Sequence, residues 1–108
     1  MSEAAHQIVF TTCPDQAIAQ KIAQTLVAEG LAACVNVLPA MHSIYTWKGK
    51  IESSTEHLLL IKSQTQRYPA LQDRLRALHP YELPEIVAVP ITHGLPEYLA
   101  WLNHPDSN

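Results

Sequence analysis

Short apolar runs and alternating apolar and polar positions predict four β-strands. They cover residues 8–11, 32–47, 50–63 and 86–91. A tight turn at Lys48-Gly49 joins the second and third strands into a hairpin. Pro39 interrupts the second strand, and Pro90 lies near the end of the fourth. Because proline cannot donate a backbone hydrogen bond, each marks an edge, a bulge or a strand end.

Apolar residues at helical spacing predict a helix between the first two strands. Ile18, Ile22 and Leu26 recur every four residues and form one face. Asp15 stands where an N-cap is needed, and Gly30 stands where a left-handed residue can close the helix. The helix is therefore expected between Asp15 and Gly30.

Two further helices are predicted, one before and one after the fourth strand. The first has Thr65 as its expected cap and Pro69 in its first turn, where a missing N–H is tolerated. It must end near Leu78, because Pro80 disfavours helical geometry at the residue before it. Residues 96–102 form the short closing helix.

The predicted elements follow the order β-α-β-β-α-β with one additional helix. Two right-handed βαβ crossovers then interleave in one antiparallel sheet. The predicted fold class is α+β, a ferredoxin-like βαββαβ sandwich with a long hairpin and an extra C-terminal helix. A chain of 108 residues has the size of one domain, so residues 1–108 are expected to form one.

The predicted hairpin is longer than the body of the domain. About sixteen residues at roughly 3.3 Å each give a strand of about 50 Å, whereas a domain of this size is about 35 Å wide. The far part carries Ile44, Tyr45, Trp47 and Ile51, too much apolar area to remain without a partner. A hairpin bent at Pro39 is the alternative, and self-association is preferred. The expected interface anchors are Tyr45, Trp47, Tyr98 and Trp101.

Composition narrows the class of partner. The net charge is -3, and the seven basic residues are dispersed, whereas a nucleic-acid surface needs a dense basic stripe. No apolar run approaches the roughly 20 residues that span a bilayer, and the first residues do not resemble a secretory signal. Cys13 and Cys34 suit a reducing compartment better than a disulfide framework. We expect a cytoplasmic protein that binds neither nucleic acid nor membrane.

Five segments resemble the CutA divalent-cation-tolerance family in order and spacing. They are LAACVNVLP, SIYTWKGKIE, LLLIKS, HPYELPEIVAVPI and YLAWL, spread between residues 7 and 103. The resemblance implies a ferredoxin-like subunit in a tight homotrimer, joined through the long hairpin and the strand edges. It also implies a non-catalytic role in the response to metal ions, with copper binding proposed for some members.

The copper ligands proposed for the family match this chain in part. Members with the proposed site carry a cysteine at the end of the first strand and a His-His pair before Pro-Tyr. This chain has Thr11 at the strand position, Cys13 two residues later, and Leu78 before His79. His79 and Cys13 remain as candidate metal ligands, an imidazole and a soft thiolate that suit copper. The structural alternative is that HPYELPE is a rigid connector in which His79 hydrogen-bonds the end of the second helix.

Two other functions stay open. The family resembles the PII signalling proteins in architecture, which suggests a sensor that binds a small anion or nucleotide between subunits. A stable trimeric scaffold is the third hypothesis. Catalysis is not expected, because the chain has no G-x-S-x-G, C-x-x-C or P-loop motif. Glu82 and Glu85 form a carboxylate pair that gains meaning only in a cleft, and Lys62 is a possible partner of Glu85.

Overall fold

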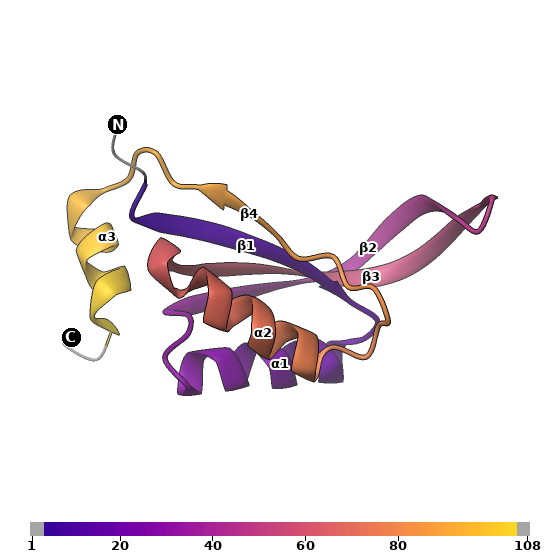
Figure 1. The fold of residues 1–108 in the computed structure, drawn as a ribbon, viewed down its shortest axis with the longest axis horizontal. Coiled ribbons are helices and arrows are strands. Elements are labelled where there is room, and N and C mark those ends of the chain that lie inside the picture. Colours follow the sequence, from indigo (N-terminus) through magenta and orange to yellow (C-terminus); the bar gives the residue numbers. More distant parts are fainter. Residues whose placement is uncertain (1–3, 106–108) are drawn as a thin grey trace.

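Four antiparallel strands in the order β2-β3-β1-β4 form the sheet of the computed structural model, which describes residues 4–105 (Figure 1). The strands are β1 His6–Cys13, β2 Cys34–Trp47, β3 Lys50–Gln64 and β4 Val87–Pro90. The helices are α1 Gln16–Ala28, α2 Tyr68–Leu78 and α3 Pro96–Asn103, with a 3-10 turn η1 at Thr65–Arg67. This strand order is that of a ferredoxin-like sheet and confirms the predicted fold class.

The predicted limits of α1 are confirmed. The carboxylate of Asp15 accepts a hydrogen bond from the backbone N–H of Ile18 at 2.9 Å, as an N-cap should. Beyond the last turn, Gly30 adopts a φ of 73°, a conformation that suits glycine. Sequence-local chemistry therefore sets both ends of this helix.

The predicted start of α2 was wrong. The hydroxyl of Thr65 donates to the carbonyl oxygen of Ala4 at 2.8 Å, so it ties the chain start to the end of β3 rather than capping a helix. A 3-10 turn follows, and α2 begins at Tyr68 with Pro69 in its first turn. The hydroxyl found a tertiary partner that local spacing could not reveal.

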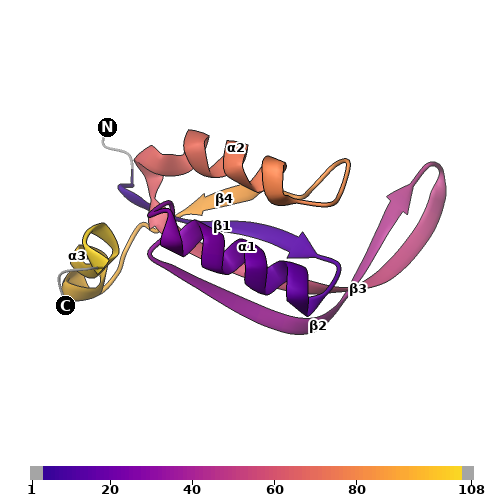
Figure 2. The ribbon, with the colours of Figure 1, turned by 90° about the horizontal axis from the view of Figure 1, so that it is seen from below.

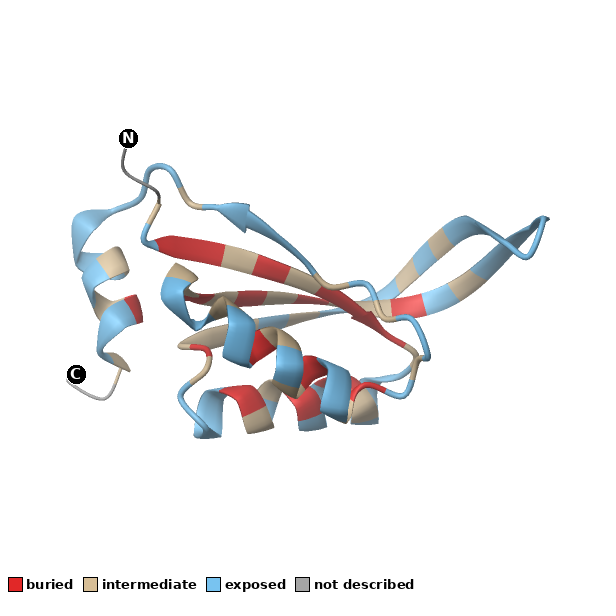
Figure 3. Ribbon diagram, viewed as in Figure 1, coloured by how far each residue is buried: buried red, intermediate tan, exposed pale blue. Residues whose placement is uncertain are grey.

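Helices α1 and α2 cover one face of the sheet, as Figure 2 shows. The core lies between them and the strands, where Figure 3 marks most of the buried positions. Its buried members are Val9, Cys13, Ala19, Ile22, Leu26, Ala32, Leu59, Ile61, Leu71 and Leu75. Alternate residues of β1 and β3 supply the sheet side of this core. Because successive side chains of a strand point to opposite faces, the other apolar residues of these two strands lie on the far side of the sheet.

Apart from its end, where Lys62 approaches Tyr98 of α3, the opposite face of the sheet carries large apolar side chains but no covering helix. Residues paired across antiparallel strands share a side of the sheet, so the register assigns this face. Its members are Ile8, Phe10 and Thr12 on β1, Leu58, Leu60 and Lys62 on β3, Leu38 on β2, and Val87 and Val89 on β4. We call it the helix-free face. Leu38, Val87 and Val89 are 41%, 51% and 43% exposed.

The hairpin of β2 and β3 projects beyond the body of the molecule and bends where it leaves the sheet (Figures 1 and 2). The pairing of the two strands shifts between Leu38 and Met41, and Ala40 has a positive φ of 53°. The predicted bulge at Pro39 and the predicted overhang are thus both present, in a molecule 45 Å long and 32 Å wide. We call residues 41–56 the arm.

Helix α3 docks at the end of the sheet away from the arm (Figure 1). Leu102 is 2% exposed, and Asn103 forms a hydrogen bond of 2.8 Å between its Oδ1 and Nε2 of His6. Gln64 donates to the carbonyl oxygen of Asn103 at 3.3 Å. Within residues 4–105, no helix has both the length and the apolar character needed to cross a bilayer.

Candidate functional site

The segment HPYELPE, residues 79–85, connects α2 to β4 and passes the end of β1 at the base of the arm (Figure 1). Nε2 of His79 lies 2.8 Å from the carbonyl oxygen of Thr12, and its Nδ1 lies 3.2 Å from the backbone N of Tyr81. A carbonyl oxygen only accepts and a backbone N–H only donates. The ring proton therefore lies on Nε2, and both nitrogens are occupied.

The predicted hydrogen bond from His79 to the end of α2 is present through the backbone, whereas the ring makes a different contact. The ring binds the end of β1 instead of the last carbonyls of α2. The backbone N–H of His79 serves the helix end, donating to the carbonyl oxygen of Leu75 at 2.9 Å. With an exposure of 8%, His79 is a buried link between the connector and the sheet.

The second candidate metal ligand, Cys13, lies fully buried in the core. Burial, with smaller contributions from the charges of Glu56 and Asp15, raises the pKa of its thiol to about 11. The thiol is therefore protonated near neutral pH, whereas metals bind the thiolate. Within the described residues, no group of three His, Cys, Asp or Glu side chains is placed to hold a metal ion. The roles of His79 and Cys13 as metal ligands stay predictions.

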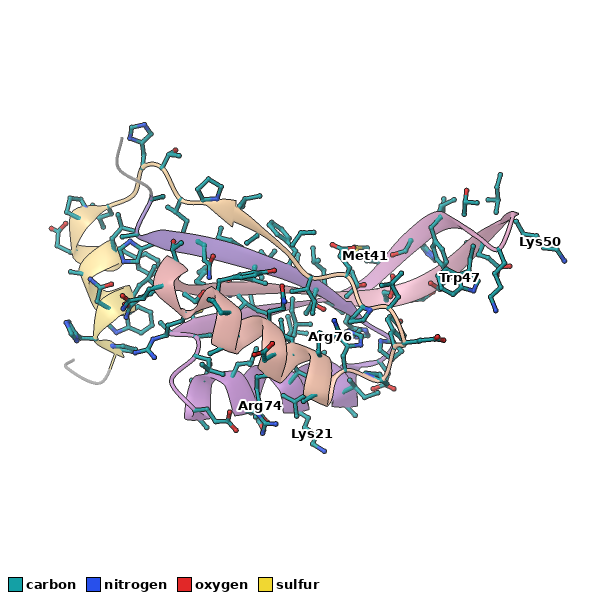
Figure 4. All side chains as sticks on the ribbon, viewed as in Figure 1. Lys21, Met41, Trp47, Lys50, Arg74 and Arg76 are labelled. Carbon is teal, nitrogen blue, oxygen red and sulfur yellow. The ribbon has the colours of Figure 1, made fainter. Side chains whose placement is uncertain are left out.

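A hollow of about 680 Å³ lies between the arm and the connector. It is lined by Thr12, Ser43, Ile44, Tyr45, Trp47, Ser54, Glu56, Tyr81, Glu82, Leu83 and Glu85. The arm supplies one wall, because Ser43, Tyr45 and Trp47 alternate along β2 and share a side of the hairpin. Figure 4 shows Trp47 far out on the arm, next to the turn that ends at Lys50. The connector supplies the other wall.

The two walls are joined by a hydrogen bond. The hydroxyl of Tyr81 donates to Oε2 of Glu56 at 2.8 Å, although Glu56 is only 6% exposed. Removal from water, followed by the hydrogen bond and charge of Glu56, holds the pKa of Tyr81 well above its usual range. The ion pair formed within residues 4–105 joins Arg74 to Glu29 on the helical side, so Glu56 has no cationic partner there.

The hollow is acidic. Glu56, Glu82 and Glu85 line it, and no described lysine or arginine does. The predicted carboxylate pair Glu82 and Glu85 thus lies beside a cleft. The possible pair of Lys62 with Glu85, less favoured than two solvated charges, is absent from the described residues, where the ammonium of Lys62 lies 5.8 Å from the ring centre of Tyr98.

Sequence reasoning missed Glu56 and Thr12 as lining residues. Glu56 stands in a long alternating strand, where a carboxylate normally faces water. It is buried because the connector, distant in sequence, crosses that point of β3. An acidic residue just before the core run Leu58 to Ile61 was the available signal.

The four predicted interface anchors fall into two groups at opposite ends of the molecule (Figure 1). On the arm, Tyr45 and Trp47 are 43% and 44% exposed. On α3, Tyr98 is 38% exposed and its ring centre lies 5.7 Å from that of Trp101. The indole N–H of Trp101 is buried and has no hydrogen-bond partner among the described residues. One chain leaves both groups uncovered or unsatisfied.

Comparison with known proteins places these features in a family. The family model described as CutA1 divalent ion tolerance protein matches residues 7–105. A divalent-cation tolerance protein CutA from Thermus thermophilus is 50% identical over 96 residues, covering 89% of this chain and 93% of that protein. The human protein CutA is 48% identical over 93 residues, and this chain spans about half of its length (52%).

Solved structures agree with the sequence comparison. CutA1 from Shewanella sp. SIB1 has a TM-score of 0.93 at 41% identity, covering 99% of this chain and 100% of that chain. CutA from Xylella fastidiosa has a TM-score of 0.90 at 50% identity, covering 93% and 96%. A relative from Archaeoglobus fulgidus, with a TM-score of 0.88 at 38% identity over 91% and 95%, is described as periplasmic. From the family match and these relatives, this chain belongs to the CutA1 divalent ion tolerance protein family.

Proposed function

We propose that this protein is a non-catalytic homotrimer that takes part in the response to divalent metal ions. One observation supports the assembly: the helix-free face and the arm both expose large apolar side chains. On the arm, Ile44 and Ile51 are 75% and 82% exposed. Covering one such side chain stabilises an assembly by about 1.5–3 kcal/mol. Patches of this kind normally mark an interface.

The sheet also has edges available for a second copy. Strands β2 and β4 are the outer strands, and within the described chain each is paired on one side only. Unpaired edges are templates for strand addition from another chain. Because one copy would offer β2 and another β4, the contact is heterologous, and such contacts form a ring when the rotation between copies closes. The number three rests on the family resemblance.

Copper binding through His79 and Cys13 is the weaker part of the proposal. A metal at His79 would have to displace the hydrogen bond to Thr12 or the one from Tyr81. A metal at Cys13 would have to bind a buried thiol whose pKa is raised. Metal binding releases the thiol proton, so this cost weakens the affinity at neutral pH.

The PII-like alternative, an anion or nucleotide sensor, is less compatible with the acidic hollow. Glu56, Glu82 and Glu85 would repel a phosphate there. The cytoplasmic location expected from the sequence remains part of the proposal.

The test combines assembly with ligand class. Val89→Glu places a charge on the helix-free face, and Glu97→Gln on exposed α3 is its control. We expect the first variant to dissociate and the second to remain assembled in sedimentation velocity. Calorimetric titration of the wild type with Cu(II), Zn(II) and ATP should give saturable heat for a divalent cation and none for ATP. Saturable ATP binding without metal binding would favour the sensor instead.

A further inference from the structure

The hollow at the base of the arm contains a buried carboxylate whose charge nothing in the described chain offsets. Glu56 is 6% exposed and receives its hydrogen bond from a neutral hydroxyl, that of Tyr81. Glu82 and Glu85 add two carboxylates to the same wall. A buried anion without a counter-charge is costly, so the hollow favours a cation.

A second feature of the hollow is an unused hydroxyl. Thr12 is 6% exposed, lines the hollow, and makes no side-chain hydrogen bond within residues 4–105. The ring of His79 hydrogen-bonds the backbone carbonyl oxygen of Thr12 and not its hydroxyl. The hydroxyl is therefore available to accept a hydrogen bond from a donor in the hollow, and such polar groups in nearly buried positions are normally paired.

Aromatic rings form the third feature. Tyr45, Trp47 and Tyr81 line the hollow together with the apolar side chains of Ile44 and Leu83. Aromatic faces attract ammonium and guanidinium groups. The Trp47 ring already does so on this chain, since Nζ of Lys48 lies 5.9 Å from its centre.

This combination does not suit a chelated metal ion. No set of three His, Cys, Asp or Glu side chains converges on one point within the described residues. Aromatic and aliphatic walls do not coordinate a metal ion. An organic cation has both a charged head and an apolar stem that can pack against such walls.

We propose that the hollow binds an alkylammonium group, with Glu56 facing the charge, Thr12 accepting an N–H hydrogen bond and the rings of Tyr81 and Tyr45, on the near part of the walls, holding the stem. The group is supplied either by a small free amine or by a lysine of a second copy of this chain. The site extends beyond the proposed trimer and metal role. A free amine requires neither of them, whereas a lysine of a second copy requires self-association.

The test is calorimetric titration of the full chain with n-butylammonium chloride, with n-pentanol as the neutral probe of similar shape. We expect saturable amine binding and at least tenfold weaker pentanol binding. Glu56→Gln keeps the shape and an acceptor for Tyr81 but removes the charge, and should weaken amine binding about tenfold or more. Thr12→Val should weaken it about threefold to tenfold. Glu97→Gln, an exposed carboxylate on α3, should change nothing.

If a lysine of a second copy fills the hollow, the free amine gives no heat. In that case Glu56→Gln should weaken self-association at least tenfold in sedimentation velocity while Glu97→Gln does not. The proposal is overturned if the amine binds wild type and Glu56→Gln equally. It is also overturned if no amine binds and Glu56→Gln leaves self-association unchanged. A trimer with neither amine binding nor an effect of Glu56→Gln would contradict this site but not the proposed trimer. A monomer that binds the amine would contradict the trimer but not this site.

Discussion

The hydroxyl of Tyr81 and the carboxylate of Glu56 hold the connector against β3, at a separation of 2.8 Å between Oη and Oε2. The two residues are 25 positions apart in sequence, and their bond closes the base of the hollow. Because Glu56 is buried, the loss of its donor leaves a charged acceptor unsatisfied.

Tyr81→Phe should therefore lower the free energy of unfolding by about 1–3 kcal/mol. The measurement is urea denaturation at neutral pH. Tyr68→Phe is the matched control, because the hydroxyl of Tyr68 makes no hydrogen bond within the described residues. Equal stability of Tyr81→Phe and wild type would show that water satisfies Glu56 equally well.

His79→Ala should lower the melting temperature, because the hydrogen bond to Thr12 and the one from Tyr81 both disappear. Each kcal/mol of lost stability corresponds to a decrease of roughly 4–8 °C. Copper affinity should change less than tenfold, since both ring nitrogens are already engaged. The measurement is a paired thermal melt and copper titration, with exposed His93→Ala as control. An unchanged melt combined with lost copper binding would make residue 79 a metal ligand.

Stability should decline at high pH through Cys13. Its folded pKa of about 11 exceeds the usual thiol pKa of 9.0. The unfolded thiol therefore loses its proton first, so the stabilisation is complete below pH 9 and is lost as pH rises through 11. We expect a loss of about 2–3 kcal/mol over this interval, because the shift spans about two pKa units at about 1.4 kcal/mol each. Urea denaturation at each pH should show a smaller decline in Cys13→Ala, while the same decline in both proteins would assign it to other groups.

Trp47 should contribute more to assembly than its neighbour Lys48. Trp47 presents a large, half-exposed aromatic surface on the arm, and truncation of such a residue in an interface costs about 2 kcal/mol or more. Lys48 lies at the turn with a positive φ of 51°. Sedimentation velocity should show Trp47→Ala dissociating at higher concentrations than Lys48→Ala. Identical dissociation of the two variants would place the interface elsewhere.

The fold could be predicted from the sequence because its signals are local. Alternation and helical spacing report which face of an element is apolar, and Asp15 and Gly30 mark the ends of α1 through their own backbone needs. Thr65 shows the limit of this reasoning. Its hydroxyl is placed along the chain where it could cap a helix. It instead donates to the carbonyl oxygen of Ala4, which the sheet brings near.

The candidate site was harder to predict for the same reason. Glu82 and Glu85 were recognised as a pair, but Glu56 and Thr12 join them only because the connector crosses β3 at the base of the arm. Likewise, His79 bonds the end of its own helix through its backbone, as expected, but its ring binds a strand 67 positions away. Long-range packing decides these contacts, and spacing along the chain does not encode it directly.

Sedimentation equilibrium of the wild-type protein at micromolar concentration tests the central claim most directly. The uncovered sheet face and arm should bring three chains of 12.0 kDa together, giving about 36 kDa. The mass should stay constant across a tenfold dilution. A single species of 12.0 kDa over that range would contradict the account.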